Sequence, residues 1–261
     1  MNKLYYTPQE GFVVYNNYKI TDKNVPSVIF LHGLMSNMSG EKALYLMDYC
    51  KKNNYNFIAF DNFGHGNASG NFVSQTIGSW LSGLELVLDK LIDDEAILIG
   101  SSMGGWLGIL AALNFPSKIK AKIKALICLA PAADFTEDIW QNLSKEDKTK
   151  MQQEGFLEIS GRNCRDKYPI SYNLILEAKN HLLLMRDNID INIPIHLIHG
   201  MLDEDVPYNI SIKLLEKIVS KKMVMKLIKD GNHKLSREED LKIIVNSLEE
   251  VITATKLKNI L

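Results

Sequence analysis

Short apolar runs alternate with longer amphipathic stretches from residue 25 onward, and no other feature of the sequence constrains the fold as strongly. The apolar runs are typical of strands buried on both faces, and they cover residues 27–31, 57–60, 96–99, 125–129, 195–198 and 223–228. The amphipathic stretches have helical spacing and cover residues 41–52, 77–91, 103–113, 210–219 and 237–257. Strands and helices that alternate in this way form a mostly parallel central sheet with helices on both faces. The predicted fold class is therefore α/β.

Two segments depart from this alternation. Residues 4–20 mix polar and apolar positions around Asn16 and Asn17, which predicts an antiparallel edge hairpin with its turn at the two asparagines. Residues 132–192 contain no run typical of a buried strand. Because long structureless loops are uncommon in compact domains, this insertion is predicted to form a helical cap. The 261 residues are then a single domain, 1–261, with a cap insertion at about 132–192.

Charge and cysteine content narrow the range of partners and compartments. Lys and Arg total 30 and Asp and Glu total 31, so the net charge of -1 gives no general attraction to nucleic acid or to an anionic membrane. The three cysteines are widely spaced and odd in number, which favours a reducing compartment. The start lacks the apolar stretch of a secretory signal, and the longest apolar run, at about 123–133, is too short to span a bilayer. These features predict a cytoplasmic protein without an integral membrane segment, and they specify no oligomeric state.

One apolar run leads directly into a Gly-x-Ser-x-Gly sequence formed by Gly100, Ser102 and Gly104, and a helical pattern follows it. A nucleophilic serine on a strained, exposed turn requires this order of strand, turn and helix. The glycines are needed because side chains at their positions would collide with the neighbouring strand and helix. Ser102 is therefore the predicted nucleophile.

A serine hydroxyl becomes a good nucleophile only when a histidine, held by a carboxylate, takes its proton. Where the serine follows a strand in this way, the acid and then the histidine follow later strands. Among the six histidines only His233 lies beyond the last predicted strand, in a polar loop that contains a glycine. His233 is therefore the predicted base, and an ordinary surface histidine is the alternative.

The acid is expected after the run at 195–198, where Asp203, Glu204 and Asp205 crowd together. Asp203 is favoured because it falls first, in a Gly-x-x-Asp-x-x-Val-Pro sequence, and Asp205 is the alternative. The loop lacks the ligand spacing of a calcium site, and solvation accounts for the surplus charge. The histidines do not show His-x-x-x-His spacing, so a metal-dependent hydrolase is not indicated, and no metal or cofactor is predicted.

A developing oxyanion needs backbone N–H donors. Met103 is expected to supply one, since it follows the nucleophile at a helix N-terminus. Leu34, in the loop after the run at 27–31, is expected to supply the second. His32 in the same loop precedes the serine and is interpreted as a residue that braces the loop.

Three of the remaining histidines are given structural interpretations. His65 lies in a glycine-rich turn, and because no Gly-Lys-Ser/Thr follows, a tight turn is preferred over a phosphate site. His181 is interpreted as a structural residue of the cap and His196 as a structural residue of a strand.

In chain order, these motifs resemble those of the α/β-hydrolase superfamily over nearly the full length of the chain. The resemblance rests on strand-His32-Gly33, Asp61-x-x-Gly64-x-Gly66, Gly100-x-Ser102-x-Gly104, Asp203-x-x-Val206-Pro207 and His233. More closely, residues 100–107, His199-Gly200-Met201-x-Asp203 and Asn232-His233 are similar to the group of abhydrolase-domain palmitoyl-protein thioesterases and acyl-glucuronide esterases. One departure is Asn62-Phe63, where many α/β-hydrolases carry an arginine.

The resemblance implies hydrolysis of an S-acyl cysteine or of an activated acyl ester, with Ser102, Asp203 and His233 as the triad. The expected partner is then a small-molecule ester or thioester, or an acylated protein. A carboxylesterase of small metabolite esters uses the same triad and is the main alternative. A non-catalytic binding module on the same fold is the alternative of another class, but it normally lacks one triad residue, and all three are present here.

The cap sequence suggests substrate contacts of two kinds. Its apolar candidates are expected either to line an acyl tunnel or to form the core of the cap itself, and they are Trp140, Phe156, Leu157 and Tyr172. Its basic candidates are expected either to anchor an anionic leaving group or to form a solvated face, and they are Arg162, Arg165 and Lys167.

Overall fold

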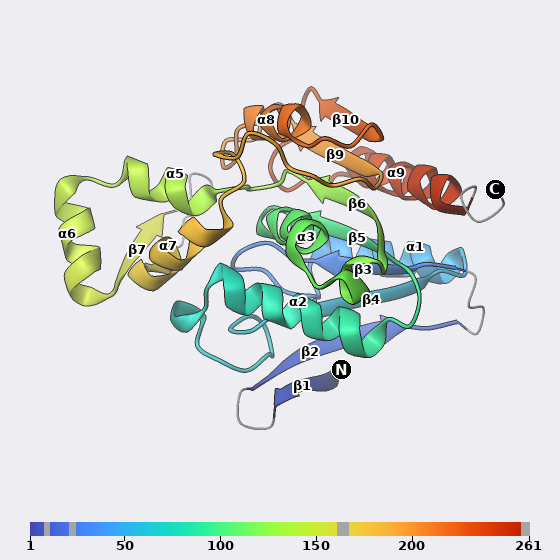
Figure 1. Cartoon of the computed structure of the whole chain (residues 1–261), viewed down its shortest axis with the longest axis horizontal. Helices are drawn as coiled ribbons and strands as arrows, with labels where there is room; N and C mark the ends of the chain where they lie inside the picture. Colours follow the sequence, from blue (N-terminus) through green and yellow to red (C-terminus); the bar gives the residue numbers. More distant parts are fainter. Residues whose placement is uncertain (8–10, 21–24, 161–166, 257–261) are drawn as a thin grey trace.

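The computed structural model describes residues 1–7, 11–20, 25–160 and 167–256, and its centre is an eight-stranded sheet (Figure 1). The strand order across the sheet is β1-β2-β4-β3-β5-β6-β9-β10. These strands are β1 (Asn2–Thr7), β2 (Gly11–Tyr18), β3 (Ser27–Leu31), β4 (Asn56–Asp61), β5 (Ala96–Ser101), β6 (Ile123–Leu129), β9 (Ile195–Gly200) and β10 (Met223–Ile228). The two pairings that involve β2 are antiparallel, and all the others in this sheet are parallel. The α/β prediction is confirmed, and each predicted strand is present with its boundaries moved by a few residues at most.

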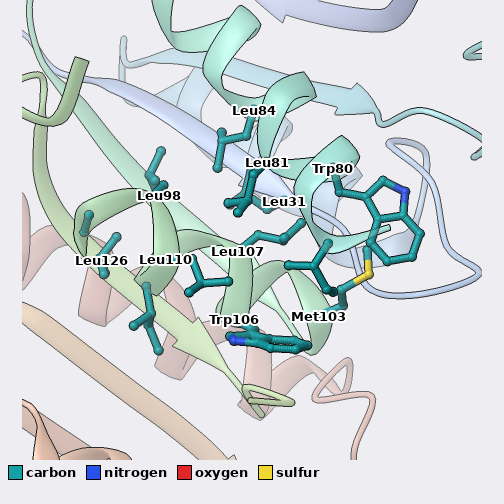
Figure 2. Packing of buried hydrophobic residues seen from close by; sticks show 14 of the residues in the cluster. Leu31, Trp80, Leu81, Leu84, Leu98, Met103, Trp106, Leu107, Leu110 and Leu126 are labelled. Carbon is teal, nitrogen blue, oxygen red and sulfur yellow. The ribbon is translucent and has the colours of Figure 1, made fainter. Parts of the chain in front are cut away.

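Helices cover both faces of this sheet. They are α1 (Glu41–Lys52), α2 (Ile77–Leu91), α3 (Met103–Asn114), α4 (Ser117–Lys120), α8 (Asn209–Lys217) and α9 (Glu238–Lys256), with a short 3-10 turn, η1 (Phe72–Ser74), before α2. One buried cluster joins α2, α3 and α8 to one face of the sheet, and a second cluster joins α1 and α9 to the other face. Ile29 belongs to the first cluster and Phe30 to the second, because successive side chains of a strand point to opposite faces. Figure 2 shows part of the first cluster, to which α2 contributes Leu84, α3 contributes Leu107 and the sheet contributes Leu98.

The N-terminal hairpin is present, but its turn is not where the sequence suggested. β1 pairs antiparallel with β2 at the edge of the sheet, as predicted. Asn16 and Asn17 lie inside β2, opposite Ala59 and Ile58 of β4. The predicted turn at the two asparagines is therefore wrong, because pairing with β4 keeps this part of the chain extended. The connection between β1 and β2 lies outside the described residues.

The cap insertion forms a separate group of elements at one end of the molecule (Figure 1). Its elements are α5 (Phe135–Asn142), α6 (Lys145–Glu154), β7 (Phe156–Ser160), β8 (Lys167–Ser171), α7 (Tyr172–Ala178) and the 3-10 turn η2 (Lys179–His181). The insertion is largely helical, as expected, but β7 and β8 form an antiparallel pair that was not expected. These two strands are short and partly exposed, so they need no continuous apolar run and leave no such signal in the sequence.

Within the described part of the chain, no helix has both the length and the apolar character that crossing a bilayer requires.

Candidate active site

Ser102 lies on the sharp turn between β5 and α3. Its φ of 55° and ψ of −118° are an uncommon combination for a residue with a Cβ atom, and such a conformation persists only where the surroundings hold it. Two backbone hydrogen bonds do so: the Ser102 N–H donates to the Leu129 carbonyl at 2.8 Å, and the Ser102 carbonyl accepts from the Ala132 N–H at 3.1 Å. The strained turn is thereby fastened to the end of β6.

The glycines on either side of Ser102 allow close packing. A Cβ atom on Gly100 would collide with the backbone of Gly104, and a Cβ atom on Gly104 would collide with the backbone of Leu31. The first contact lies within the turn, and the second lies between α3 and β3. The packing therefore requires the Gly-x-Ser-x-Gly spacing for the reason that the sequence suggested.

Ser102, His233 and Asp203 are joined by hydrogen bonds into one chain. His233 Nε2 lies 3.1 Å from Ser102 Oγ, and His233 Nδ1 lies 2.7 Å from Asp203 Oδ2. Because a carboxylate oxygen only accepts, Nδ1 carries the hydrogen and the lone pair of Nε2 faces the serine hydroxyl. The Asp203 side chain is 0% exposed and that of His233 is 21% exposed. The arrangement can thus take a proton from the serine while it keeps the acid out of water.

Four hydrogen bonds hold the carboxylate of Asp203. Oδ2 accepts from His233 and, at 3.1 Å, from Nε2 of His199. Oδ1 accepts from the backbone N–H groups of Asp205 and Val206, at 3.0 Å and 2.8 Å. Burial acts to raise the pKa of Asp203, but the hydrogen bonds from His199 and His233 and the charge of His233 outweigh it and hold this pKa well below its usual range. Asp203 is therefore an anion at neutral pH, and Asp205 supports it through its backbone.

The loops that carry the acid and the histidine are fastened to each other. The Leu202 N–H donates to the Gly231 carbonyl at 2.9 Å. A Cβ atom on Gly200 would collide with the backbone of Gly231, so the two loops approach as closely as their backbones allow. From α1, Lys42 Nζ donates to the carbonyl of Lys234, the residue after the histidine. Burial is the main cause that lowers the pKa of Lys42 to about 8.

The predicted oxyanion donors lie on the two backbone segments that flank Ser102. The loop after β3 passes so close that a Cβ atom on Gly33 would lie 3.2 Å from Ser102 Cβ. Leu34 is the next residue of that loop. Met103 is the first residue of α3, and the helix itself does not use the N–H groups of its first turn. Both backbone N–H groups therefore lie on segments adjacent to the serine hydroxyl.

His32 joins the two loops beside the site. Its Nδ1 donates to the Gly33 carbonyl at 2.8 Å, and its Nε2 accepts from the Asn62 N–H at 3.2 Å. Burial is the main cause that lowers the pKa of His32, so the ring is neutral. The predicted role in bracing the loop is confirmed. The tight turn at His65 is also confirmed, with Gly64 and Gly66 at positive φ.

Known proteins are similar to this chain in sequence and in fold. The family model described as "alpha/beta hydrolase fold" matches residues 26–189. The chain belongs to the α/β hydrolase family. The mitochondrial palmitoyl-protein thioesterase ABHD10 of Mus musculus is 34% identical to it over 236 residues, which cover 90% of this chain and 78% of the mouse protein.

Two solved structures extend the comparison. Alpha/beta hydrolase domain-containing protein 10 from mouse has a TM-score of 0.87 and 32% identity, over 97% of this chain and 98% of that chain. An Agrobacterium vitis S4 protein described as a hydrolase has a TM-score of 0.89 and 29% identity, over 96% of this chain and 97% of that chain. The predicted resemblance to α/β hydrolases, and to palmitoyl-protein thioesterases among them, is confirmed.

This α/β hydrolase has a second histidine at the acid, to which the sequence analysis gave no role. His199 is the fifth residue of β9, is 0% exposed, and its Nε2 lies 3.1 Å from Asp203 Oδ2. The only sequence signal was its place in the His-Gly-Met-x-Asp motif, four residues before the acid. The other strand histidine, His196, does not contact the triad in the described structure and fits the structural role that was predicted.

The acidic loop of the hydrolase contains groups that could bind a cation. Asp203, Asp205 and His233 offer ligand atoms that lie within 4.8 Å of one another. Two of these residues already bond to each other at 2.7 Å, and His233 also faces Ser102. A cation there would have to replace these bonds, so we assign the cluster to the triad.

The apolar cap candidates differ in their surroundings. The rings of Trp140 and Tyr172 pack with centroids 5.7 Å apart, and Lys148 Nζ lies 5.4 Å from the Trp140 centroid. Leu157 is buried in the main apolar cluster, whereas Phe156 is 39% exposed. Trp140, Leu157 and Tyr172 thus pack against other side chains, as residues of an apolar core do. The acyl tunnel stays a prediction.

The basic cap candidates are only partly covered by the structure. Arg162 and Arg165 lie outside the described residues, as does Cys164. Lys167 is exposed at the start of β8. An anchor for an anionic leaving group at these positions stays a prediction.

Polar contacts join the two ends of the cap to each other and join the cap to the body of the hydrolase. Asp134, with φ at 60°, accepts from the N–H groups of Leu183 and Leu184, both at 2.8 Å. Glu177 of α7 accepts from the Gly78 N–H at the start of α2, at 3.2 Å and 3.3 Å. The positive end of a helix stabilises a carboxylate in this position. They add to the apolar packing of the cap on the body, in which Leu174 and Ile175 belong to the same buried cluster as α2 and α3.

Proposed function

We propose that this α/β hydrolase is a serine hydrolase that cleaves acyl thioesters or esters through an acyl-enzyme intermediate. The observation that carries the proposal is the hydrogen-bonded chain of Ser102, His233 and Asp203, at 3.1 Å and 2.7 Å. The strained backbone of Ser102 supports it further, because strain of this kind is typical of a nucleophile on a strand-to-helix turn.

In the first half of the reaction, Ser102 Oγ attacks the acyl carbonyl while its proton passes to Nε2 of His233. Asp203 keeps Nδ1 of His233 protonated and stabilises the cation that forms. The N–H groups of Leu34 and Met103 stabilise the oxyanion of the tetrahedral intermediate. This intermediate then expels the thiolate or alkoxide, which takes the proton from His233 Nε2 and leaves Ser102 acylated.

In the second half, a water molecule attacks the acyl carbonyl and gives its proton to His233 Nε2. The same N–H groups stabilise the second oxyanion, and Ser102 Oγ leaves and recovers the proton. The products are a carboxylic acid and a thiol or an alcohol. The sequence of steps uses only side chains, backbone N–H groups and water.

The preferred substrate class is an S-acylated cysteine of a protein, and S-depalmitoylation is the specific proposal. It is supported by the relative named palmitoyl-protein thioesterase, which shares 34% identity with this chain over 90% of its length. A carboxylesterase of small esters is the alternative, since it uses the same three side chains. A binding module without catalysis is disfavoured because no triad side chain is missing and all three are aligned.

The test compares kcat/KM for matched acyl thioesters and oxygen esters of rising chain length, in the wild type and in Ser102→Ala. A preference for long-chain thioesters that the substitution abolishes is the expected result. A preference for short oxygen esters would favour the carboxylesterase. Activity that survives Ser102→Ala would overturn the serine mechanism, and an acyl group found on Ser102 by mass spectrometry after rapid quenching would support it directly.

The cellular location is a separate question. The relative is named as mitochondrial, and for this chain the cytoplasm stays the prediction. Fractionation of cells that produce the native protein, followed by immunoblotting, would test it.

A further inference from the structure

His199 is enclosed by polar partners on both of its ring nitrogens. Nε2 lies 3.1 Å from Asp203 Oδ2 and 2.9 Å from the Val206 carbonyl, and Nδ1 lies 2.7 Å from Ser211 Oγ of α8. Both partners of Nε2 are acceptors, so Nε2 carries a hydrogen. His199 and Ser211 are each 0% exposed, so water does not compete for these bonds. The orientation of the ring is thus defined by the fold.

These contacts lengthen the catalytic chain by two residues, to Ser211, His199, Asp203, His233 and Ser102. We propose that His199 is a positioning residue that fixes the Asp203 carboxylate and limits how strongly that carboxylate holds the proton on His233. The inference rests on the proposed serine mechanism and adds to it a residue that sets the pH range in which His233 acts as a base.

The two hydrogen bonds accepted by Oδ2 of Asp203 support this proposal. The single oxygen Oδ2 accepts from His233 Nδ1 at 2.7 Å and from His199 Nε2 at 3.1 Å, so two donors share its negative charge. Oδ1 is held by two backbone N–H groups, which no side-chain substitution removes. Without His199, more of the charge on Oδ2 would act on His233 and favour its protonated form. The carboxylate would also lose one of the four bonds that orient it.

Two substitutions separate this role from simple packing. The amide of asparagine reaches about as far as Nδ1 of a histidine, and that of glutamine about as far as Nε2. His199→Asn therefore keeps a group near Ser211 and loses the bond to Asp203, whereas His199→Gln keeps a donor near Asp203. Both variants are polar and of similar size. His196→Asn, at the buried histidine three residues earlier in β9, controls for damage to the strand.

The readout is the rate at which a fluorophosphonate labels Ser102 between pH 5 and pH 9, since this reaction needs the triad but not the natural substrate. His199→Asn is expected to lower the maximal rate by about 10- to 100-fold, because a displaced carboxylate misaligns the base. It is also expected to move the acid limb of the profile, which reports protonation of His233, up by about half a pH unit. His199→Gln and His196→Asn are expected to keep the wild-type limb.

Two results would overturn the inference. One is that the labelling rate depends on pH in the same way in His199→Asn and His199→Gln. The other is that Ser102 is labelled more slowly in both variants while the acid limb stays where it is in the wild type. A wild type whose Ser102 does not react would instead overturn the serine mechanism itself. A second measurement needs no variant. In protein labelled with ¹⁵N-histidine, the nitrogen shifts of His199 are expected to show a hydrogen on Nε2, and a hydrogen on Nδ1 alone would contradict the assignment.

Discussion

The carboxyl edge of the sheet and the cap differ in the contacts that hold their parts together. At the sheet edge, Ser102, Asp203 and His233 lie on short segments that follow β5, β9 and β10, and hydrogen bonds and close glycine contacts join these segments to one another. The cap packs on the body of the protein through apolar side chains, among them Leu174 and Ile175 of α7, which belong to the same buried cluster as α2 and α3, and through the polar contact of Glu177 with Gly78. The cap also contains a two-stranded sheet that is partly exposed.

This difference separates two tasks that a hydrolase must perform. Catalysis needs atoms held within a fraction of an ångström, and the rigid end of a buried sheet provides that. We propose that the cap selects the acyl group, since an inserted surface segment can vary without disturbing the residues at the sheet edge. Substitutions at the sheet edge are therefore expected to affect all substrates alike, and those in the cap to affect substrates by their length.

The largest effect is expected at the acid. Asp203→Asn should lower kcat/KM by about 10⁴-fold for short esters and long-chain thioesters alike, because an amide stabilises the wrong hydrogen position on His233. Asp205→Asn is the matched control, since Asp205 contributes its backbone N–H and not its carboxylate to Asp203. It should keep the activity close to that of the wild type. A loss in Asp205→Asn and not in Asp203→Asn would show that the acid is wrongly assigned.

The next effect is expected where the two ends of the cap meet. Asp134→Ala should destabilise the protein by about 2 kcal/mol, because it leaves the N–H groups of Leu183 and Leu184 without their acceptor. It should also lower kcat/KM more for long-chain than for short-chain substrates. Urea unfolding and chain-length kinetics measure the two quantities. Asp138→Ala, at an exposed position of the same helix, is the control, and an equal loss on all chain lengths would contradict the division of tasks.

The pH dependence of the free energy of unfolding tests one residue of the sheet edge, His65, without involving the cap. Burial, and next the neighbouring His32, lower the pKa of His65 to about 3. Between pH 6.5 and about 3, the unfolded chain then binds a proton that the native protein does not. This contribution to stability is complete above pH 6.5 and falls by about 1.4 kcal/mol for each pH unit below it.

We therefore expect the free energy of unfolding to fall by about 2 kcal/mol from this source between pH 6.5 and pH 5. His65→Phe should reduce the fall, since phenylalanine keeps the ring contacts with Phe72 and Trp80 but does not titrate. Urea unfolding of the wild type and of His65→Phe at pH 6.5 and pH 5 measures this fall. The difference in free energy of unfolding between the two proteins at pH 7 is the reference. An unchanged fall in the variant would show that His65 is not the source.

The smallest effect is expected at the surface of the cap. Phe156 is the apolar candidate that contributes least to the cap core, so it tests the acyl tunnel with little disturbance of folding. If its ring contacts the acyl chain, Phe156→Ala should lower the ratio of long-chain to short-chain kcat/KM by about fivefold, which corresponds to about 1 kcal/mol of lost apolar contact. Leu176→Ala, at another exposed position of the cap, is the control. An unchanged ratio with an unchanged melting temperature would remove Phe156 from the tunnel.

Much of the sheet edge was predictable because its signals are local. The apolar runs marked the strands of the parallel sheet, and the glycines beside Ser102 marked the turn where close packing forbids a side chain. The order of Ser102, Asp203 and His233 along the chain followed from the order of the strands that carry them. Less of the cap was predictable, because β7 and β8 pair with each other and not with a buried sheet, so their apolar content is low.

The sequence by itself determined the fold class and predicted the nucleophile and a short list of acids and bases, because periodicity and glycine spacing reflect packing within a few residues of each position. The tertiary structure alone decided that the Asp203 carboxylate contacts His233, that Asn16 and Asn17 belong to a strand, and that His199 supplies a second side-chain donor to the acid. These outcomes depend on which loops meet and in which direction side chains point after the chain has packed. Local patterns do not encode those directions, since they are fixed by contacts between residues far apart in the sequence.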